Sequence, residues 1–218
     1  MSPTPNSPGT AAPQTPVWAD ASRQALADAS ERYNAAASQI EQATTAPQAA
    51  FAKQSAMEGL YYVRAARTAM GIDPGPPLQA LAGQRGAGEV TEDRRIQFDG
   101  RQIQASPGPT AATPNYYPGG RVAGRPVPEG WYSEPWWKPA LVAGAWGVGS
   151  VLLFDALFDG MHGVNYGAQG FESGFGSGFD QGYQQGLDQS QFAGLVNPLD
   201  SVLESLSDCS QIAGARLE

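Results

Sequence analysis

Residues 139–158 restrict the fold of this chain more than any other feature, because a single charge, Asp155, interrupts a run of small and apolar residues. As one helix rising about 1.5 Å per residue, this stretch spans about 30 Å, the hydrocarbon thickness of a bilayer. Its Leu, Val and Phe side chains favour insertion by about 4 kcal/mol, and Asp155 is close enough to the far end to reach the interface. The stretch therefore predicts one transmembrane helix within residues 136–159.

The residues that border this stretch fit the same prediction. Trp and Lys side chains are typical of the interface between membrane and water. We expect a membrane anchor made by Trp136, Trp137 and Lys138. A helix buried in a soluble domain or against a partner is the alternative interpretation. This alternative requires a large surrounding core, and a chain with 27 Gly and 18 Pro residues is not expected to form one.

The basic residues predict an orientation for this helix. Arg121, Arg125 and Lys138 precede the stretch, and no Lys or Arg follows it until Arg216. Because basic residues stay on the cytoplasmic side of a membrane, we expect a cell-membrane protein with a cytoplasmic N-terminus and an outer C-terminus. Membrane lipid is then one of its partners.

Small residues spaced four apart occur inside the same stretch and include Gly144 and Gly147. Such positions allow two helices to approach closely in lipid. They predict self-association through this face, and the alternative is an accident of a composition rich in Ala and Gly.

The N-terminal region carries the clearest helical pattern. Residues 1–16 are rich in Pro and poor in hydrophobic side chains, which predicts a disordered tail. From residue 17, apolar residues recur at steps of three and four, the pattern of one helix face. Pro47 suits the first turn of a second helix and Gly71 suits its end. Residues 17–72 therefore predict an antiparallel helical hairpin, and the fold class is mainly α.

Residues 73–135 predict a linker that carries one β-hairpin. Asp99-Gly100 stands between alternating apolar and polar residues at 95–104, a strong hairpin signal that places the two isoleucines opposite each other. Pro and Gly dominate the remainder and favour an extended spacer. The segment Arg125-Pro-Val-Pro also fits a ligand of a proline-reading domain.

A four-residue unit recurs five times in a row within residues 160–190: Gly, then an aromatic residue or Leu, then two mostly polar residues. On a helix this period aligns the glycines in a slowly turning stripe that admits another backbone closely. Each Gly costs a helix about 1 kcal/mol, so a disordered segment is the alternative to a helix that forms on association. The protein-interaction residues that we expect here are Gly170, Gly174, Gly178, Gly182 and Gly186.

The spacing of this repeat resembles the Gly-xxx-Gly helices of the flagellar export ATPase regulator family, which implies a shared packing device and no shared function. Beyond the repeat, residues 191–218 predict a short amphipathic helix, because apolar residues such as Leu199, Leu203 and Leu206 recur at helical spacing. This helix serves either as a second packing element or as a contact to a membrane surface.

The chain offers few residues for chemistry. Cys209 is its only cysteine and His162 its only histidine, so we expect no disulfide within the chain and no zinc site. Asp155 and Asp159 fall on one helix face, where such a pair more often marks the end of a membrane helix than a cation site. Motifs for acyl transfer, phosphate binding, zinc proteases and calcium loops are absent from the sequence. We therefore expect no enzyme activity, cofactor, metal or small-molecule substrate.

The net charge of −8 belongs to the C-terminal part of the chain. Residues 1–138 contain 12 basic and 12 acidic side chains, whereas residues 139–218 contain one basic and nine acidic ones. Neither part has the basic surface that nucleic-acid binding requires. Nucleic acid is therefore excluded as a partner.

Together these features predict a single-pass membrane-anchored scaffold or assembly protein that is non-enzymatic and self-associates. Its helical hairpin is offered to an unidentified protein partner. Two other functions stay open. One is a non-catalytic subunit that buries the apolar helix against a larger complex. The other is an envelope-stress or transport accessory protein whose acidic tail acts as a sensor.

Overall fold

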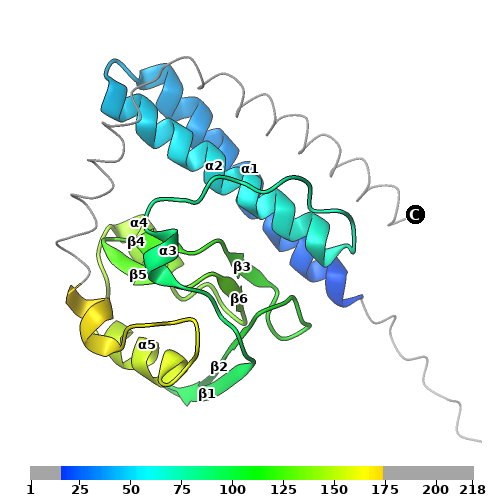
Figure 1. Cartoon of the computed structure of the whole chain (residues 1–218), viewed down its shortest axis with the longest axis vertical. Coiled ribbons are helices and arrows are strands. Elements are labelled where there is room, and N and C mark those ends of the chain that lie inside the picture. The colour runs from blue at the N-terminus through cyan, green and yellow to red at the C-terminus, as the bar shows by residue number, and fades with distance from the viewer. Residues whose placement is uncertain (1–15, 174–218) are drawn as a thin grey trace, which may run out of the picture.

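Two long antiparallel helices form the first part of the fold, and a small β-sheet domain packs against one side of them (Figure 1). The computed structural model describes residues 16–173. The predicted N-terminal tail up to residue 15, the repeat from Gly174 onward and the C-terminal helix lie outside the described residues. The two long helices are α1 (Val17–Gln42) and α2 (Ala46–Ala69).

Local sequence signals set the ends of α2. A capping box joins Thr45 and Gln48, and the Gln48 side chain accepts a hydrogen bond from the Thr45 N–H at 3.0 Å. At the other end Gly71 has a φ of +69°, and the Ile72 N–H donates to the Arg67 carbonyl oxygen at 2.9 Å. This left-handed residue ends the helix where the sequence predicts the end of the hairpin.

Alanine dominates the contact between the two helices, and aromatic rings join them to the sheet. Small side chains let the two backbones approach closely, and the buried ones include Ala21, Ala25, Ala29, Ala52, Ala56 and Ala66. The Tyr62 ring of α2 meets the Tyr116 ring edge-on at 5.9 Å, and Tyr116 contacts Trp131 at 5.1 Å. The hairpin is therefore fixed to the sheet domain by a separate cluster of rings.

The sheet domain is antiparallel. Four strands lie in the order β1-β2-β6-β3, and β4 and β5 form a separate ribbon. The strands are β1 (Arg94–Phe98), β2 (Arg101–Ser106), β3 (Asn115–Tyr117), β4 (Gly120–Val122), β5 (Arg125–Val127) and β6 (Gly130–Tyr132). A short helix, α3 (Gln84–Ala87), lies against the ribbon (Figure 1).

The hairpin of β1 and β2 has the register that alternation predicts. Ile96 pairs with Ile103, and both turn residues, Asp99 and Gly100, have positive φ values of 50° and 72°. Two positive φ angles match the twist of the flanking strands, which explains why Asp-Gly is favoured at this turn.

The Pro- and Gly-rich residues 105–135 are folded, which corrects the expectation of an extended spacer. Trp131 of β6 pairs with Ser106 and with Tyr116, so β6 lies between β2 and β3. The prolines lie in short strands, at strand ends and in loops, where a missing N–H costs little. The Pro and Gly content therefore reflects many tight turns and not an unstructured connection.

The prediction of a transmembrane helix is wrong. Residues 139–158 form two short helices, α4 (Lys138–Ala143) and α5 (Ser150–Phe158), separated by a loop. Gly144 and Gly149 at the two ends of this loop have φ values of +67° and +91°, which no α-helix contains. Within residues 16–173 no helix combines the length and the apolar character that crossing a bilayer requires.

The apolar side chains of this stretch instead form the core of the sheet domain. The buried ones on α5 are Leu153, Phe154, Leu157 and Phe158, which pack with Ile103, Val122 and Val127 of the strands. The sheet thus supplies the surrounding core that the composition did not promise. The predictions of a single-pass membrane protein and of a cell-membrane location, N-terminus cytoplasmic and C-terminus outside, are wrong for this reason.

Candidate interaction surface

The glycine repeat begins inside the folded part of the chain, in a cluster of aromatic rings. Residues 168–173 are helical, and Phe171, the aromatic residue of the first unit, is fully buried. Its ring stacks on Phe154 of α5 at 4.4 Å with an interplanar angle of 12°, and it meets Trp146 edge-on at 5.1 Å. Stacked and edge-on pairs contribute about 0.5–1.5 kcal/mol each beyond the burial of area. The first unit is therefore joined firmly to the sheet domain.

Arg125 also contacts this ring. Its guanidinium carbon lies 5.3 Å from the centre of the Phe171 ring, within cation–π range. One terminal nitrogen donates to the Ser150 hydroxyl at 3.1 Å, at the start of α5. The Arg125 Nε and the Trp136 Nε1 are buried and have no acceptor among residues 16–173. Two N–H donors therefore stand unpaired beside the first unit.

Gly170 is packed closely against a residue of its own chain, whereas its predicted contact with another helix stays a prediction. A Cβ atom at this position would lie 2.8 Å from the Cβ of Tyr166, too close for any side chain without a shift. Tyr166 itself stacks on Phe154 at 5.2 Å, and its hydroxyl donates to the Ala87 carbonyl oxygen at 3.2 Å. Burial raises the pKa of this hydroxyl. Glycine in the first unit thus makes room for the half-buried Tyr166.

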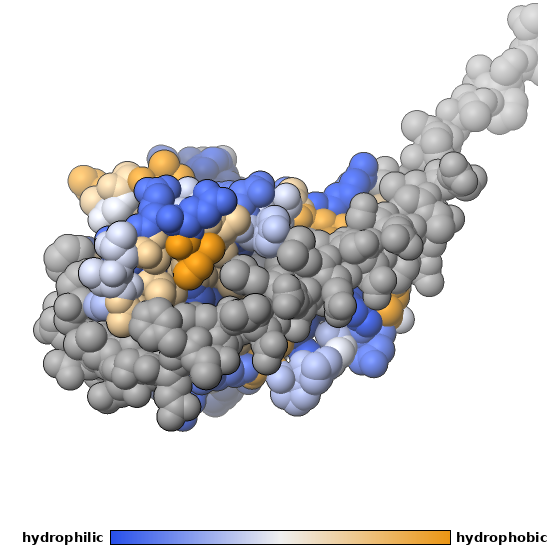
Figure 2. Space-filling model, turned by 90° about the horizontal axis from the view of Figure 1, so that it is seen from above, coloured by the Kyte–Doolittle hydropathy of each residue, from blue (hydrophilic) through white to orange (hydrophobic). Residues whose placement is uncertain are grey.

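Apolar residues are exposed on the neighbouring surface. Val142, Val148 and Leu152 expose 85%, 110% and 68% of their area, and we call these three residues the apolar patch. They come from α4, the loop and α5, and no charged residue lies between Lys138 and Asp155. Hydrophobic residues, orange in Figure 2, reach the surface among hydrophilic ones in the view from above. Large exposed apolar side chains of this kind favour contact with another protein segment.

The glycines predicted to mediate contacts are separated by the structure. Gly170 is closely packed, whereas a Cβ on Gly144 or Gly147 would meet no atom within 4 Å. These two glycines lie in the exposed loop between α4 and α5 and not on a helix face. Gly174, Gly178, Gly182 and Gly186 lie outside the described residues, so their role stays a prediction.

The three residues predicted as a membrane anchor make contacts within the protein. Trp137 is buried, and its ring contacts Tyr117 and Tyr132 at 5.0 and 4.9 Å. Trp136 packs against the rings around Phe171. The Lys138 Nζ pairs with the buried Asp28 carboxylate at 2.5 Å and so joins α4 to α1. The same side chains that suit a bilayer interface thus hold the two parts of the fold together.

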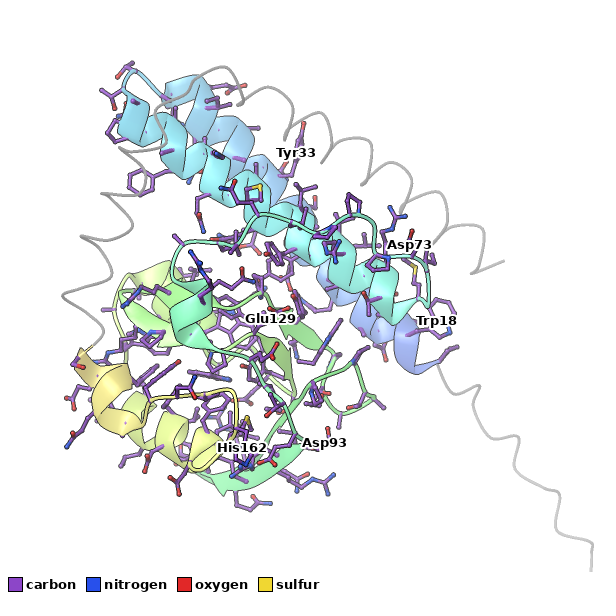
Figure 3. The ribbon with its side chains drawn as sticks, in the orientation of Figure 1. Trp18, Tyr33, Asp73, Asp93, Glu129 and His162 are labelled. Atoms are coloured by element: carbon purple, nitrogen blue, oxygen red, sulfur yellow. The ribbon has the colours of Figure 1, made fainter. Side chains whose placement is uncertain are left out.

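A polar network crosses the junction between the hairpin and the sheet domain. The Glu129 carboxylate accepts a hydrogen bond from the Tyr116 hydroxyl at 2.7 Å and one from Gln84 Nε2 at 3.4 Å. The Tyr61 hydroxyl donates to Gln84 Oε1 at 3.0 Å. Burial raises the pKa of Glu129, and the hydrogen bond from Tyr116 opposes this rise. Figure 3 shows Glu129 between the helices and the sheet, a position that favours a structural role.

The remaining chemical groups do not converge. His162 is exposed, and its carbonyl oxygen accepts a hydrogen bond from the Thr91 hydroxyl. Asp155 and Asp159 are exposed on α5 and at its end. Residues 16–173 contain no group of three or more His, Cys, Asp or Glu side chains that could hold a metal ion. The expected absence of an enzyme activity, a metal and a cofactor stays a prediction.

Comparison with known proteins gives no relative for this chain. No protein-family model, curated protein or solved structure matches it. Its function must therefore be argued from its own residues.

Two parts of this surface were not predicted from the sequence. The sequence around Arg125 was interpreted as a proline-rich ligand motif. Nothing in that local sequence predicts the contact with Phe171, which lies 46 residues further along the chain. The apolar patch was not predicted, because its three residues lie in the stretch that the sequence assigned to a membrane helix. The first repeat unit did carry a signal, since a Gly followed by Phe opens the series.

Proposed function

We propose that this protein is a non-catalytic assembly protein that self-associates through its glycine repeat, residues 170–189. The folded part, residues 16–173, holds the root of the repeat. The third and later units, from Gly178 onward, provide the contacts between copies. The burial of Phe171 is the observation that carries this proposal, because it is the one aromatic position of the repeat whose environment is described.

The packing of the first unit supports this role for the others. In that unit the aromatic ring is fully buried and the glycine leaves room for a neighbouring side chain. The same pattern recurs with Phe175, Phe179, Tyr183 and Leu187 in the aromatic position. Residues four apart share one side of a helix. Full burial of such a side chain contributes about 1.5–3 kcal/mol, which more than offsets the cost of about 1 kcal/mol per helical Gly.

Sedimentation velocity of the full chain over a wide range of concentrations tests the proposal. We expect the wild-type protein to shift to faster-sedimenting species as concentration rises. The Phe179→Ser/Tyr183→Ser variant should stay monomeric at the same concentrations, because two apolar contacts are lost while Phe171 and the fold are untouched.

The matched control is Gln181→Ala/Gln184→Ala, which changes two polar positions of the same units and keeps the aromatic ones. It should associate like the wild type. A wild-type chain that remains monomeric throughout, or equal association of both variants, contradicts the proposal. Circular dichroism of each variant verifies that the folded part is intact.

A second candidate function is that of a non-catalytic subunit in a complex with a different protein. It is favoured by Phe51 on α2, which is 54% exposed. The end of the hairpin that carries it extends beyond the sheet domain (Figure 1). A Phe51→Ser variant that loses a stoichiometric partner from native extracts, while its self-association is unchanged, would favour this second function.

A further inference from the structure

The chain runs back along α5 after that helix ends, and ring contacts give its direction. Tyr166 stacks on Phe154, in the middle of α5. Five residues later Phe171 still contacts Phe154 but also reaches Trp146, which precedes α5. Arg125 joins Phe171 to Ser150, the first residue of α5. The segment therefore proceeds from the C-terminal towards the N-terminal end of α5, beside which it lies in Figure 1.

The described part of the chain ends close to the loop that carries Val148, one residue of the apolar patch. Val148 is two residues from both Trp146 and Ser150, which mark the position of Phe171. The helix of residues 168–173 is in its first turns there, and the Phe171 N–H donates to the Gly167 carbonyl oxygen at 3.0 Å. A helix rises about 6 Å over four residues and places residues four apart on nearly the same side.

We propose that the apolar patch is the docking surface for the second repeat unit of the same chain, with Phe175 covering Val148. The chain direction supplies the occupant, and the tether is only a few residues long, so the effective concentration of this unit at the patch is high. This inference does not depend on the proposed self-association.

The substitution Val148→Asp tests whether Phe175 covers Val148. The melting temperature changes in opposite directions for a covered and for a solvent-exposed valine. Val148 precedes Gly149, the residue before α5, so an acid there favours the helix dipole and should leave or slightly raise the stability of an open site. If Phe175 covers the site, a buried carboxylate lowers the melting temperature of the full chain. We expect Val148→Asp and Phe175→Ala each to lower it by about 2–4 °C.

A double-mutant cycle shows whether the two residues touch. The combined variant Val148→Asp/Phe175→Ala should fall by less than the sum of the single shifts, because the second change removes a contact that is already lost. The matched control combines Val148→Asp with Ser177→Ala. Ser177 follows Phe175 by two residues, and residues two apart lie on opposite sides of a helix. That pair should be additive.

Concentration and hydrogen exchange complete the test. The shifts should be the same over a hundredfold dilution, and the amides of residues 174–180 should lose protection in Val148→Asp. Shifts that appear only at high concentration assign the patch to a second copy and overturn the inference. An unchanged or raised melting temperature in Val148→Asp, additive effects with Phe175→Ala, or unprotected amides at 174–180 in the wild type also overturn it.

Discussion

The helical hairpin and the stretch of residues 139–158 are both rich in alanine, yet one matches its sequence pattern and the other does not. In the hairpin the apolar residues recur with helical spacing, and α1 and α2 each continue for more than twenty residues. In the apolar stretch glycines with positive φ interrupt the helix, and α5 is only nine residues long. Spacing therefore identified helices more reliably here than hydrophobicity did.

The difference lies in what surrounds each region. Most of the cover for the hairpin is local, because α1 and α2 follow one another in the sequence and bury alanines along both helices. The stretch needs strands that come from distant parts of the sequence, such as those of Ile103 and Val122. A hydrophobic segment that is buried by strands from distant parts of the sequence has the same composition as one that is buried in lipid.

The largest effect is expected from Phe154→Ala on α5. Phe154 is fully buried and contacts the rings of Phe158, Tyr166 and Phe171. Removing it should lower the free energy of unfolding by about 3–5 kcal/mol, from lost burial and a residual cavity. Urea denaturation of the full chain measures this value. The exposed Asp155→Asn change on the same helix should stay within about 0.5 kcal/mol, and a similarly small effect for Phe154→Ala would show that α5 is not the core.

An intermediate effect is expected where the apolar stretch breaks. Gly149 has a φ of +91°, so Gly149→Ala should lower the free energy of unfolding by about 1–2 kcal/mol. A Cβ atom on Gly147 would meet no atom within 4 Å, and its φ is not positive, so Gly147→Ala should be nearly neutral. In one continuous helix both substitutions would instead stabilise, since alanine is the better helix former. Thermal unfolding of the two variants side by side separates these outcomes.

The smallest effect concerns the junction between the hairpin and the sheet domain. Burial raises the pKa of Glu129, so the folded state binds its proton more tightly than the unfolded state does. The stability due to this group is present below its unfolded pKa and is lost as pH rises through its folded pKa. Glu129→Gln removes this dependence while an oxygen still accepts the hydrogen bond from Tyr116. The stability of the wild type relative to the variant should therefore decrease from about pH 4 to about pH 7, and a relative stability that rises over this range would assign Glu129 a lowered pKa.

Sequence reasoning reached the parts of the fold whose causes are local. Pro47 lies in the first turn of α2, Gly71 ends the hairpin, and Asp99-Gly100 makes the turn between β1 and β2. Each of these signals acts within a few residues. The hairpin and the first two strands followed from them.

The remaining strands and the surface around Phe171 did not follow from local signals. Strands of three residues, such as β3 and β6, are too short to show alternation. Their pairing depends on contacts between Trp131 and two separate segments. The repeat in the sequence identifies Gly170 and Phe171 as its first unit. Only the three-dimensional fold brings Arg125 and Trp146 to the Phe171 ring.

Residue-resolved hydrogen exchange across residues 139–158 of the full chain tests the central claim most directly. The account holds that this stretch is a broken, folded core element and not one helix. It predicts slow exchange at the buried end of α5, where the Leu153 N–H donates to the Gly149 carbonyl oxygen, and fast exchange at residues 145–147 of the loop. Uninterrupted protection from residue 142 to residue 158 would contradict it.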